Sequence, residues 1–373
     1  DGAVLHTPNA KEAKPGNTVF LTIDSRLQKV ANESLAKAIQ SSGQPDCIAG
    51  GVVALSVKDF SVLAAATYPS YDLAKLTEPG YYSQLANDKA NPLFNRAFQG
   101  AFAPGSIFKP LVACGALEEG VLTTEDKIKC VGIYHYPGHN FTTKCLGVHG
   151  NADLNYAMAK SCNVYFSEAG RRLGIENMNL YAKRFGLGVK TGIELTETTG
   201  ILAGPEYSRS IGSRWSNLVT IKAAIGQSDN QFSPLQLATY VATIANGGNR
   251  YRPHLIRKIT DYRRENIVME NNPDSPELVE TAGVSEEHLN MVKTAMRQVV
   301  LSGTATNFNG YMVPVAAKTG TAQNNGSDHT TFICFAPYEN PEIAIAVVVE
   351  HGAKGMVSKI VAKDIMDAYF SNK

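Results

Sequence analysis

A serine and a lysine three positions apart could together perform nucleophilic catalysis. Ser106 offers a hydroxyl, and Lys109 lies one helical turn further on, so both side chains share one helix face. The preceding Pro104 and Gly105, with the apolar run that follows, predict that Ser106 stands at a helix start, where backbone N–H groups favour negative charge. Burial would lower the pKa of Lys109 and let its amine take the hydroxyl proton.

Two further motifs offer groups that such a nucleophile needs. Ser161 and Asn163 supply a second hydroxyl and an amide, which suit proton relay and substrate orientation. The run Lys318–Thr321 follows an apolar, strand-like stretch and combines a cation with two threonine hydroxyls, which suits a substrate carboxylate. Gly320 within this run would let a substrate approach the strand closely.

Each motif also has a second match elsewhere in the chain, so context must decide between the copies. Ser34 begins the competing Ser-x-x-Lys match but lies inside a predicted helix, where surface polarity is the better interpretation. Ser228 lies in a predicted loop and Lys190 in a glycine-rich turn. The retained motifs occur in one order along the chain, and that combination is far more specific than any single match.

Three cysteines and a histidine have types suited to a metal ion: Cys130, Cys145, His149 and Cys162. Three thiolates and an imidazole would suit tetrahedral Zn²⁺ in a closed structural site. Since Cys162 lies inside the second motif, such a metal would anchor the active-site loop from behind. His135 and His139 could substitute as ligands. A Cys130–Cys145 disulfide, or reduced cysteines in the core, are the alternatives.

Apolar periodicity predicts the elements that position these motifs. Expected strands are 19–23, 51–57, 61–67, 313–322, 330–336 and 343–350, and expected helices follow Asp24 and Ser233 and cover 358–370. Between about 95 and 298 the pattern is mostly helical and loop-like. These elements predict an α/β (α+β) fold, in which an antiparallel sheet of about five strands is built from both chain ends and flanked by helices.

The domain organisation follows from the same pattern. Residues 1–16 are polar and carry Pro and Gly, like a linker remnant, and 17–373 form one domain. Its sheet part covers about 17–95 and 299–373, and a mostly helical subdomain of about 96–298 is inserted between them. The net charge of +1 gives no reason to expect nucleic acid. No apolar stretch is long enough to span a bilayer and no signal peptide is evident, so we expect a soluble fragment.

The ordered trio of motifs is the signature of the serine penicillin-recognising enzymes. The chain resembles a class B penicillin-binding protein transpeptidase across nearly all of 17–370. The runs that carry this resemblance beyond the trio are 102–109, 161–166, 226–227 with 233–238, and 245–248. The resemblance implies the penicilloyl-serine-transferase fold, which β-lactamases share.

The resemblance also implies a reaction. Ser106 would attack the penultimate D-Ala carbonyl of a peptidoglycan stem peptide, and an amine of a neighbouring stem would resolve the acyl-enzyme. The backbone N–H groups of Ser106 and Thr321 would hold the oxyanion, and Lys318, Thr319 and Thr321 would hold the substrate carboxylate. β-Lactams would acylate Ser106 with slow release. No cofactor is implied for catalysis, and some relatives carry structural zinc at positions matching the Cys130 group.

Several other activities are compatible with a Ser106 nucleophile. A D,D-carboxypeptidase differs only in using water as the acceptor, and a β-lactam sensor would be acylated once to signal. A β-lactamase is disfavoured because no deacylation motif is recognisable and the chain is longer than a compact lactamase needs. The resemblance further implies an N-terminal membrane anchor outside this chain, the extracytoplasmic face of the bacterial membrane, and a membrane glycosyltransferase of the elongation, division or sporulation machinery as partner.

Overall fold

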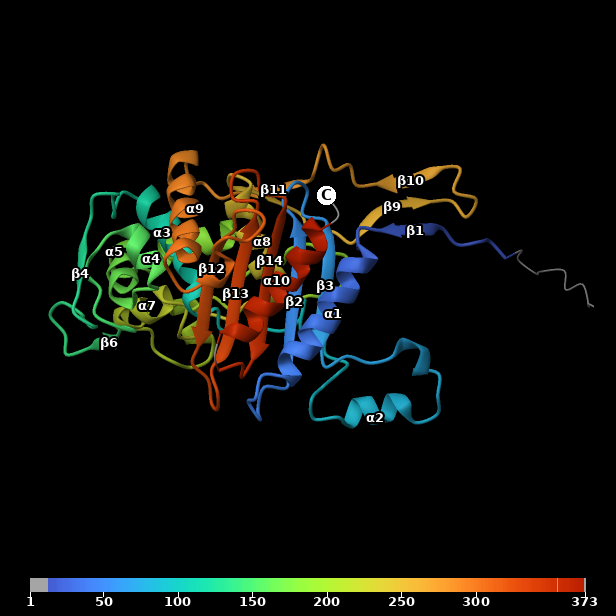
Figure 1. Cartoon of the computed structure of the whole chain (residues 1–373), viewed down its shortest axis with the longest axis horizontal. Coiled ribbons are helices and arrows are strands. Elements are labelled where there is room, and N and C mark those ends of the chain that lie inside the picture. The colour runs from blue at the N-terminus through green and yellow to red at the C-terminus, as the bar shows by residue number, and fades with distance from the viewer. Residues whose placement is uncertain (1–12, 354, 372–373) are drawn as a thin grey trace, which may run out of the picture.

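A five-stranded antiparallel sheet lies at the centre of the molecule (Figure 1). The computed structural model describes residues 13–353 and 355–371. The strands run in the order β12 (Ala316–Ala322), β13 (His329–Ala336), β14 (Ile343–Glu350), β2 (Ala49–Ser56) and β3 (Val62–Tyr68). The central pair β14–β2 joins the two chain ends, as predicted, with Ile343 opposite Ser56 and Glu350 opposite Ala49.

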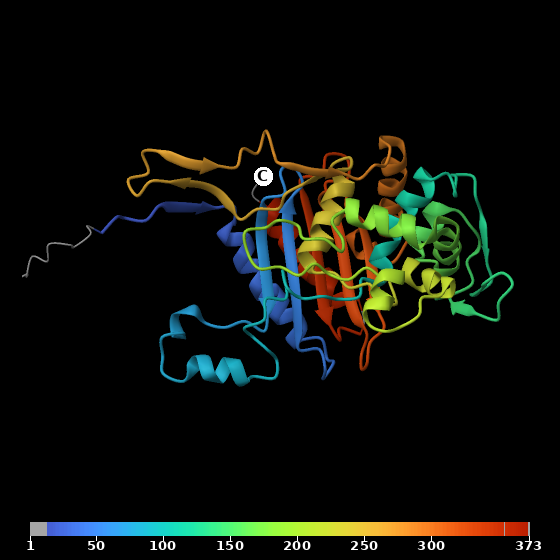
Figure 2. The same ribbon diagram turned by 180° about the vertical axis from the view of Figure 1, so that it is seen from behind.

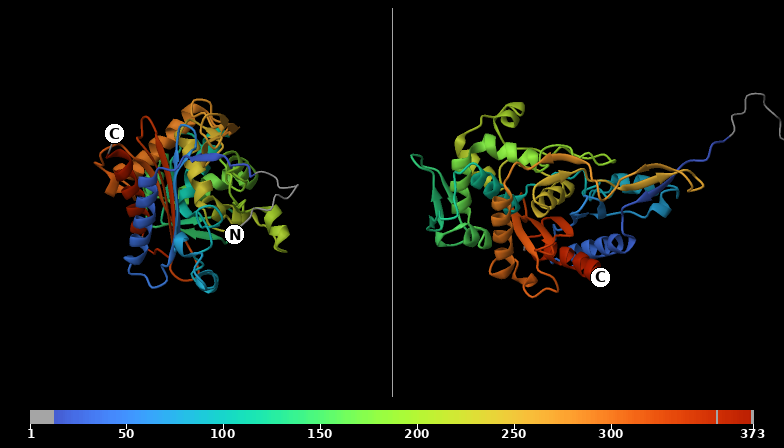
Figure 3. Two further views of the ribbon diagram at one scale, coloured as in Figure 1. Left: turned by 90° about the vertical axis from the view of Figure 1, so that its right-hand side faces the viewer. Right: turned by 90° about the horizontal axis from the view of Figure 1, so that it is seen from above.

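Helices cover both faces of this sheet, which is why its strands are apolar on both sides. Helices α1 (Ser25–Gln40) and α10 (Met356–Phe370) lie on one face, and α8 (Pro234–Ala245) lies on the other (Figures 1 and 2). The left view of Figure 3 shows the sheet between these layers. In α8 every residue is buried, and the helix follows Ser233 as predicted. Ser233 and Gln236 form a capping box at its start.

Helix α1 begins at the predicted place because Asp24 accepts hydrogen bonds from the backbone N–H groups of Arg26 and Leu27. The surface interpretation of Ser34 on this helix was wrong. Its side chain is buried and its hydroxyl donates to Asp364 of α10 over 2.6 Å. Ser34 therefore links the first helix to the last one, which a single helical pattern cannot reveal.

The first strand, β1 (Thr18–Leu21), does not join the central sheet. It pairs with β9 (Ile256–Thr260), which pairs in turn with β10 (Ile267–Glu270), and these strands project away from the rest of the molecule (Figure 3, right). The side chains of β1 alternate between half-buried and exposed, whereas nearly all of β14 is buried. This one-sided pattern suits a solvent-facing ribbon rather than a sheet covered on both faces.

The middle of the chain contains short strands beside its helices. The pairs are β4 (Ile128–Cys130) with β7 (Gly150–Ala152), β5 (Ile133–His135) with β6 (Thr142–Lys144), and β8 (Asn249–Tyr251) with β11 (Leu278–Thr281). Strands of three or four residues are too short for a periodic pattern, so the sequence did not predict them.

The remaining elements are helical. The α-helices are α2 (Tyr81–Asn87), α3 (Lys109–Glu118), α4 (Leu154–Ala159), α5 (Asn163–Arg184), α6 (Pro205–Ser210), α7 (Asn217–Ala224) and α9 (Glu286–Leu301). Single 3₁₀ turns are η1 (Leu73–Lys75), η2 (Gly105–Phe108) and η3 (Thr306–Phe308). Within 13–353 and 355–371 no helix has the length and apolarity needed to cross a bilayer. Residues 1–12 of the predicted linker lie outside the described part.

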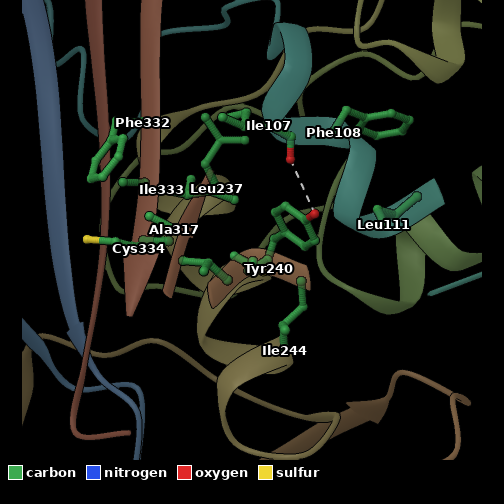
Figure 4. Packing of buried hydrophobic residues seen from close by; sticks show 14 of the residues in the cluster. Ile107, Phe108, Leu111, Leu237, Tyr240, Ile244, Ala317, Phe332, Ile333 and Cys334 are labelled. Carbon is green, nitrogen blue, oxygen red and sulfur yellow. Dashed lines mark hydrogen bonds between the residues drawn. The ribbon is translucent and has the colours of Figure 1, made fainter. Parts of the chain in front are cut away.

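The core joins α8 to the sheet on one side and to the Ser106 segment on the other (Figure 4). Leu237, Tyr240 and Ile244 of α8 pack in one cluster with Phe332 of β13 and Phe108 of η2. The phenol of Tyr240 donates a hydrogen bond to the Ile107 carbonyl over 3.3 Å. The sheet, the buried helix and the turn that carries Ser106 therefore form one packed unit.

Candidate active site

Ser106 lies in the 3₁₀ turn η2, which leads directly into α3. The predicted helix start therefore takes the form of a tighter turn, with the α-helix beginning at Lys109. Gly105 has φ of +57°, and a Cβ there would lie 2.4 Å from the carbonyl oxygen of Thr321. Only glycine fits, because the turn presses directly against the end of β12.

Three separate elements hold this turn in place. Gly105 N donates to the Gly226 carbonyl over 2.9 Å, and Thr331 of β13 donates through its hydroxyl to the Pro104 carbonyl over 2.8 Å. The phenol of Tyr240 of α8 donates to the carbonyl of Ile107, the residue after Ser106. Ser106 is thus positioned by residues far from it in sequence, of which only Gly226 lies in a run that carries the family resemblance.

Lys109 is fully buried, and its amine lies at the second motif. Its Nζ donates to the Ser161 carbonyl over 2.8 Å and to Oδ1 of Asn163 over 2.7 Å, and lies 3.1 Å from Ser161 Oγ. In the described residues its hydrogen bonds go to these two residues rather than to Ser106. Burial lowers the pKa of Lys109 to about 7, against an opposing effect of the neighbouring thiols.

Lys318 of β12 reaches the same hydroxyl as Lys109. Its Nζ donates to Ser161 Oγ over 3.0 Å and to the Thr319 carbonyl over 2.9 Å, and its side chain is fully buried. Burial lowers the pKa of Lys318 well below its ordinary value, and the nearby Lys109 adds to that effect. Ser161 Oγ therefore bridges two amines, and its backbone has φ of +54°, a conformation that non-glycine residues adopt at a cost.

The rest of the third motif faces the Ser106 turn. Thr319 is half-buried and Thr321 is exposed. At Gly320 a Cβ would lie 2.0 Å from the Thr331 hydroxyl and 2.8 Å from the Pro104 carbonyl oxygen. The missing side chain at Gly320 thus makes room for the Ser106 turn, a role that the sequence did not indicate. Close approach of substrate at this glycine stays a prediction.

The competing motif copies contain buried residues that bond to other parts of the fold. Asn230, in the second copy of the Ser-x-Asn motif, is buried and bonds to the backbone of Ala203 and Ala223. Thr191, beside Lys190, is buried and donates to the carboxylate of Glu197. Ser228 was predicted to lie in a loop, and two residues further on the buried amide of Asn230 connects two segments of the chain.

The four predicted metal ligands lie together. The ligand atoms of Cys130, Cys145, His149 and Cys162 are all within 4.8 Å of one another. His149 Nδ1 lies 3.5 Å from Cys130 Sγ and 3.4 Å from Cys145 Sγ, and the sulfurs of Cys145 and Cys162 are 3.8 Å apart. With Zn–S bonds of about 2.3 Å, tetrahedral ligands stand about 3.7 Å apart, so the donors fit this geometry.

This thiol and imidazole group lies directly behind the second motif. The backbone N–H of Asn163 donates to Cys145 Sγ over 3.2 Å, and its side-chain amide donates to the Lys144 carbonyl over 2.9 Å. None of the cysteines in the described residues is part of a disulfide, so the Cys130–Cys145 disulfide is absent from this structure. The other three cysteines are buried: Cys47, Cys114 and Cys334.

The chain is similar to proteins from several bacteria. The family model described as the penicillin binding protein transpeptidase domain matches residues 50–367. The chain belongs to the penicillin-binding protein transpeptidase domain family. The peptidoglycan D,D-transpeptidase MrdA of Acinetobacter baumannii is 33% identical to it, over 98% of this chain and 55% of MrdA. The transpeptidase domain thus spans about half the length of this curated relative, and its likeness to MrdA supports class B.

Solved structures show the same fold for this transpeptidase domain. Pseudomonas aeruginosa PBP2 in complex with WCK 5153 is 32% identical, with a TM-score of 0.83 over 95% of this chain and 76% of that chain. Penicillin-binding protein A of M. tuberculosis, as an imipenem acyl-enzyme, is 26% identical, with a TM-score of 0.83 over 95% and 80%. A chain from a peptidoglycan synthase complex is 29% identical, with a TM-score of 0.82 over 96% and 64%. The predicted fold is confirmed.

Proposed function

We propose that this chain is the catalytic domain of a peptidoglycan D,D-transpeptidase whose nucleophile is Ser106. The observation that carries the proposal is the Ser161 hydroxyl, 3.1 Å from Nζ of Lys109 and 3.0 Å from Nζ of Lys318. The Ser106 turn packs against the strand that carries Lys318. Relatives named as peptidoglycan D,D-transpeptidases support the same activity.

The reaction starts when Lys109 takes the proton of Ser106 Oγ and this oxygen attacks the carbonyl carbon of the penultimate D-Ala. The oxyanion is stabilised by the backbone N–H groups of Ser106 and Thr321. Its collapse breaks the C–N bond to the terminal D-Ala, and the proton passes through Ser161 to the leaving amine. An amine of a neighbouring stem peptide then attacks the acyl carbon, and the ester bond to Ser106 Oγ breaks. The amine's proton passes to that oxygen, which restores the Ser106 hydroxyl and completes the cross-link.

Substrate recognition falls to the second and third motifs. Lys318 supplies positive potential, and Thr319 and Thr321 donate hydrogen bonds to the terminal carboxylate across Gly320. Asn163 orients the peptide through its amide. β-Lactams present a carboxylate and a reactive carbonyl in the same relation, so they acylate Ser106. The M. tuberculosis relative is likewise known as an imipenem acyl-enzyme.

The natural setting is the bacterial cell wall. We place the domain on the extracytoplasmic face of the cell membrane, tethered by an N-terminal segment outside this chain, where peptidoglycan stem peptides are available. A membrane glycosyltransferase is the partner we propose, because a homologous chain belongs to a complex that coordinates polymerization with crosslinking. Such a partner would deliver nascent strands to Ser106.

Intact-protein mass spectrometry tests the acyl-enzyme. After exposure to benzylpenicillin, the wild-type chain should gain the mass of one penicillin, and Ser106→Ala should gain none. Ser34→Ala, at the competing motif copy, should still form the adduct. An adduct that persists in Ser106→Ala would overturn the assignment of the nucleophile.

The acceptor distinguishes the transpeptidase from its alternatives. D-Ala release from a stem-peptide donor should be accompanied by a cross-linked product when an amine acceptor is present. Hydrolysis alone, at the same rate with and without acceptor, would indicate a D,D-carboxypeptidase. Acylation by β-lactam with no D-Ala release would instead favour a sensor domain.

We also propose that the group of Cys130, Cys145, His149 and Cys162 holds a structural Zn²⁺. The chemistry of the donors and their separations support this choice. When bound, the ion would cross-link β4 and the loop after β6 to the start of α5. These residues would thereby keep Asn163 in position, since its N–H bonds to Cys145 Sγ.

Elemental analysis tests the metal proposal. The purified domain should contain about one zinc per chain, and Cys130→Ser should lose the zinc and melt at a lower temperature. Cys47→Ser changes a buried cysteine outside the group, so it should keep the zinc. A metal-free chain with a mass two protons below the reduced form would show a disulfide and contradict the proposal.

A further inference from the structure

The segment that follows α9 places a hydroxyl against the third motif. Thr304 Oγ1 lies 2.6 Å from Thr319 Oγ1, a hydrogen bond in which either oxygen could be the donor. Thr319 is half-buried in β12, while Thr304 is exposed. None of the motifs includes Thr304, and no step described so far uses it.

The backbone around Thr304 is fixed by neighbours of the second motif. A Cβ at Gly303 would lie 2.4 Å from the Ala159 carbonyl oxygen, so the segment packs directly on the end of α4. Lys160, the residue before Ser161, donates through its amine to the Ser302 carbonyl over 2.8 Å. Thr304 is therefore held in register with the residues that form the site.

The backbone of Thr304 is also tied from the other side. Lys359 of α10 donates through its amine to the Thr304 carbonyl over 3.4 Å. The next residue, Ala305, is buried and its N–H bonds to the Val299 carbonyl over 3.0 Å. A hydroxyl on a segment anchored at so many points loses little freedom when it bonds to Thr319.

We propose that Thr304 is a positioning residue that orients the Thr319 hydroxyl toward the substrate carboxylate. The inference rests on the proposed function, in which Thr319 donates to that carboxylate. A hydroxyl has one proton but can still accept. When Thr319 donates its proton to a carboxylate, its hydrogen bond with Thr304 persists only with Thr304 as the donor and Thr319 as the acceptor. The two hydrogen bonds then polarise each other. The Thr304 hydroxyl thus favours the orientation in which the Thr319 O–H points to the carboxylate.

Acylation kinetics of a matched variant set test this role. Thr304→Val keeps the shape of the side chain and removes the hydroxyl, and it should lower the second-order acylation rate with benzylpenicillin about threefold to tenfold, the ratio of one neutral hydrogen bond. Thr304→Ser should restore the wild-type rate. Thr306→Val, an exposed threonine two residues further on, should leave the rate within about twofold. Melting temperatures measured alongside show whether each variant is folded.

The ligand carboxylate gives a readout that a merely structural role would not change. Thr304→Val should leave acylation by the methyl ester of benzylpenicillin nearly unaffected, because that ligand offers no carboxylate. In a Thr319→Val background, Thr304→Val should cost nothing further. An equal loss on both ligands, or an additive loss in the double variant, would overturn the proposal.

The same experiment separates this inference from the activity on which it rests. A wild-type chain that forms no penicillin adduct would mean that the proposed function fails. A normal wild-type adduct together with a wild-type rate in Thr304→Val would reject only the role of Thr304.

Discussion

At the scale of single residues, the site is governed by two buried amines that share one hydroxyl. Lys109 and Lys318 are both 0% exposed, and both reach Ser161 Oγ. Two ammonium groups that contact the same oxygen in a buried site would repel each other and lack solvation. The structure relieves this cost by lowering the pKa of both lysines, which makes a neutral amine available near physiological pH.

The pH dependence of acylation should follow Lys109. Burial lowers its pKa from 10.5 to about 7, so the neutral base predominates above about pH 7 and the ammonium predominates below it. The acylation rate should therefore rise as pH increases through about 7 and then level off. A fluorescent penicillin measured over about pH 5.5 to 9 gives this profile.

Lys109→Arg is the control for this profile. A guanidinium stays protonated at these pH values, so the variant should show almost no acylation at any of them. A wild-type profile that stays flat from acid to alkaline pH would exclude Lys109 as the titrating base.

At the scale of elements, the position of Ser106 depends on how closely loops approach one another. The η2 turn touches the end of β12, and it also touches the loop after α7, where a Cβ on Gly226 would lie 1.9 Å from the Gly105 carbonyl oxygen. The Gly226 carbonyl serves this packing, since it accepts a hydrogen bond from Gly105 N. Two glycines from separate segments thus permit one backbone contact that sets the position of Ser106.

Gly226→Ala should consequently impair acylation by displacing the Ser106 turn. The loss should be about a hundredfold, the typical effect of misplacing a reacting group by about 1 Å. Gly43→Ala is a matched control, because Gly43 has φ of +72°, close to the +76° of Gly226, but nothing within 4 Å of an added Cβ. Both variants bear similar backbone strain, so equal acylation rates in the two would contradict this account.

At the scale of the whole molecule, the site exists only when the two chain ends combine. The β14–β2 pair closes the sheet, and Ser34 of α1 bonds to Asp364 of α10 across 330 residues. The third motif lies on β12 of this sheet, while Ser106 lies in the turn η2 and Ser161 in the turn between α4 and α5. Burial of α8 between these parts makes the alignment rigid, because its side chains contact both the sheet and η2.

Local sequence patterns were enough to predict a catalytic site and the main elements. Ser106, Lys109, Ser161, Asn163 and Lys318 were predicted as site residues because reactive groups at fixed local spacing leave a readable pattern. The central strands and the helices α1, α8 and α10 were predicted well because each buries apolar residues with a regular period over several turns or pleats. These signals are local, so they need no knowledge of the fold.

The contacts that join the motifs could be learned only from the fold. It directs the amine of Lys109 to Ser161, gives Gly320 a packing role, separates β1 from the central sheet, and brings Thr304 to Thr319. Each of these depends on contacts between segments distant in sequence, where one backbone atom or one hydroxyl meets another. Periodicity and motif spacing carry no information on such contacts, because they arise from packing geometry rather than from neighbouring residues.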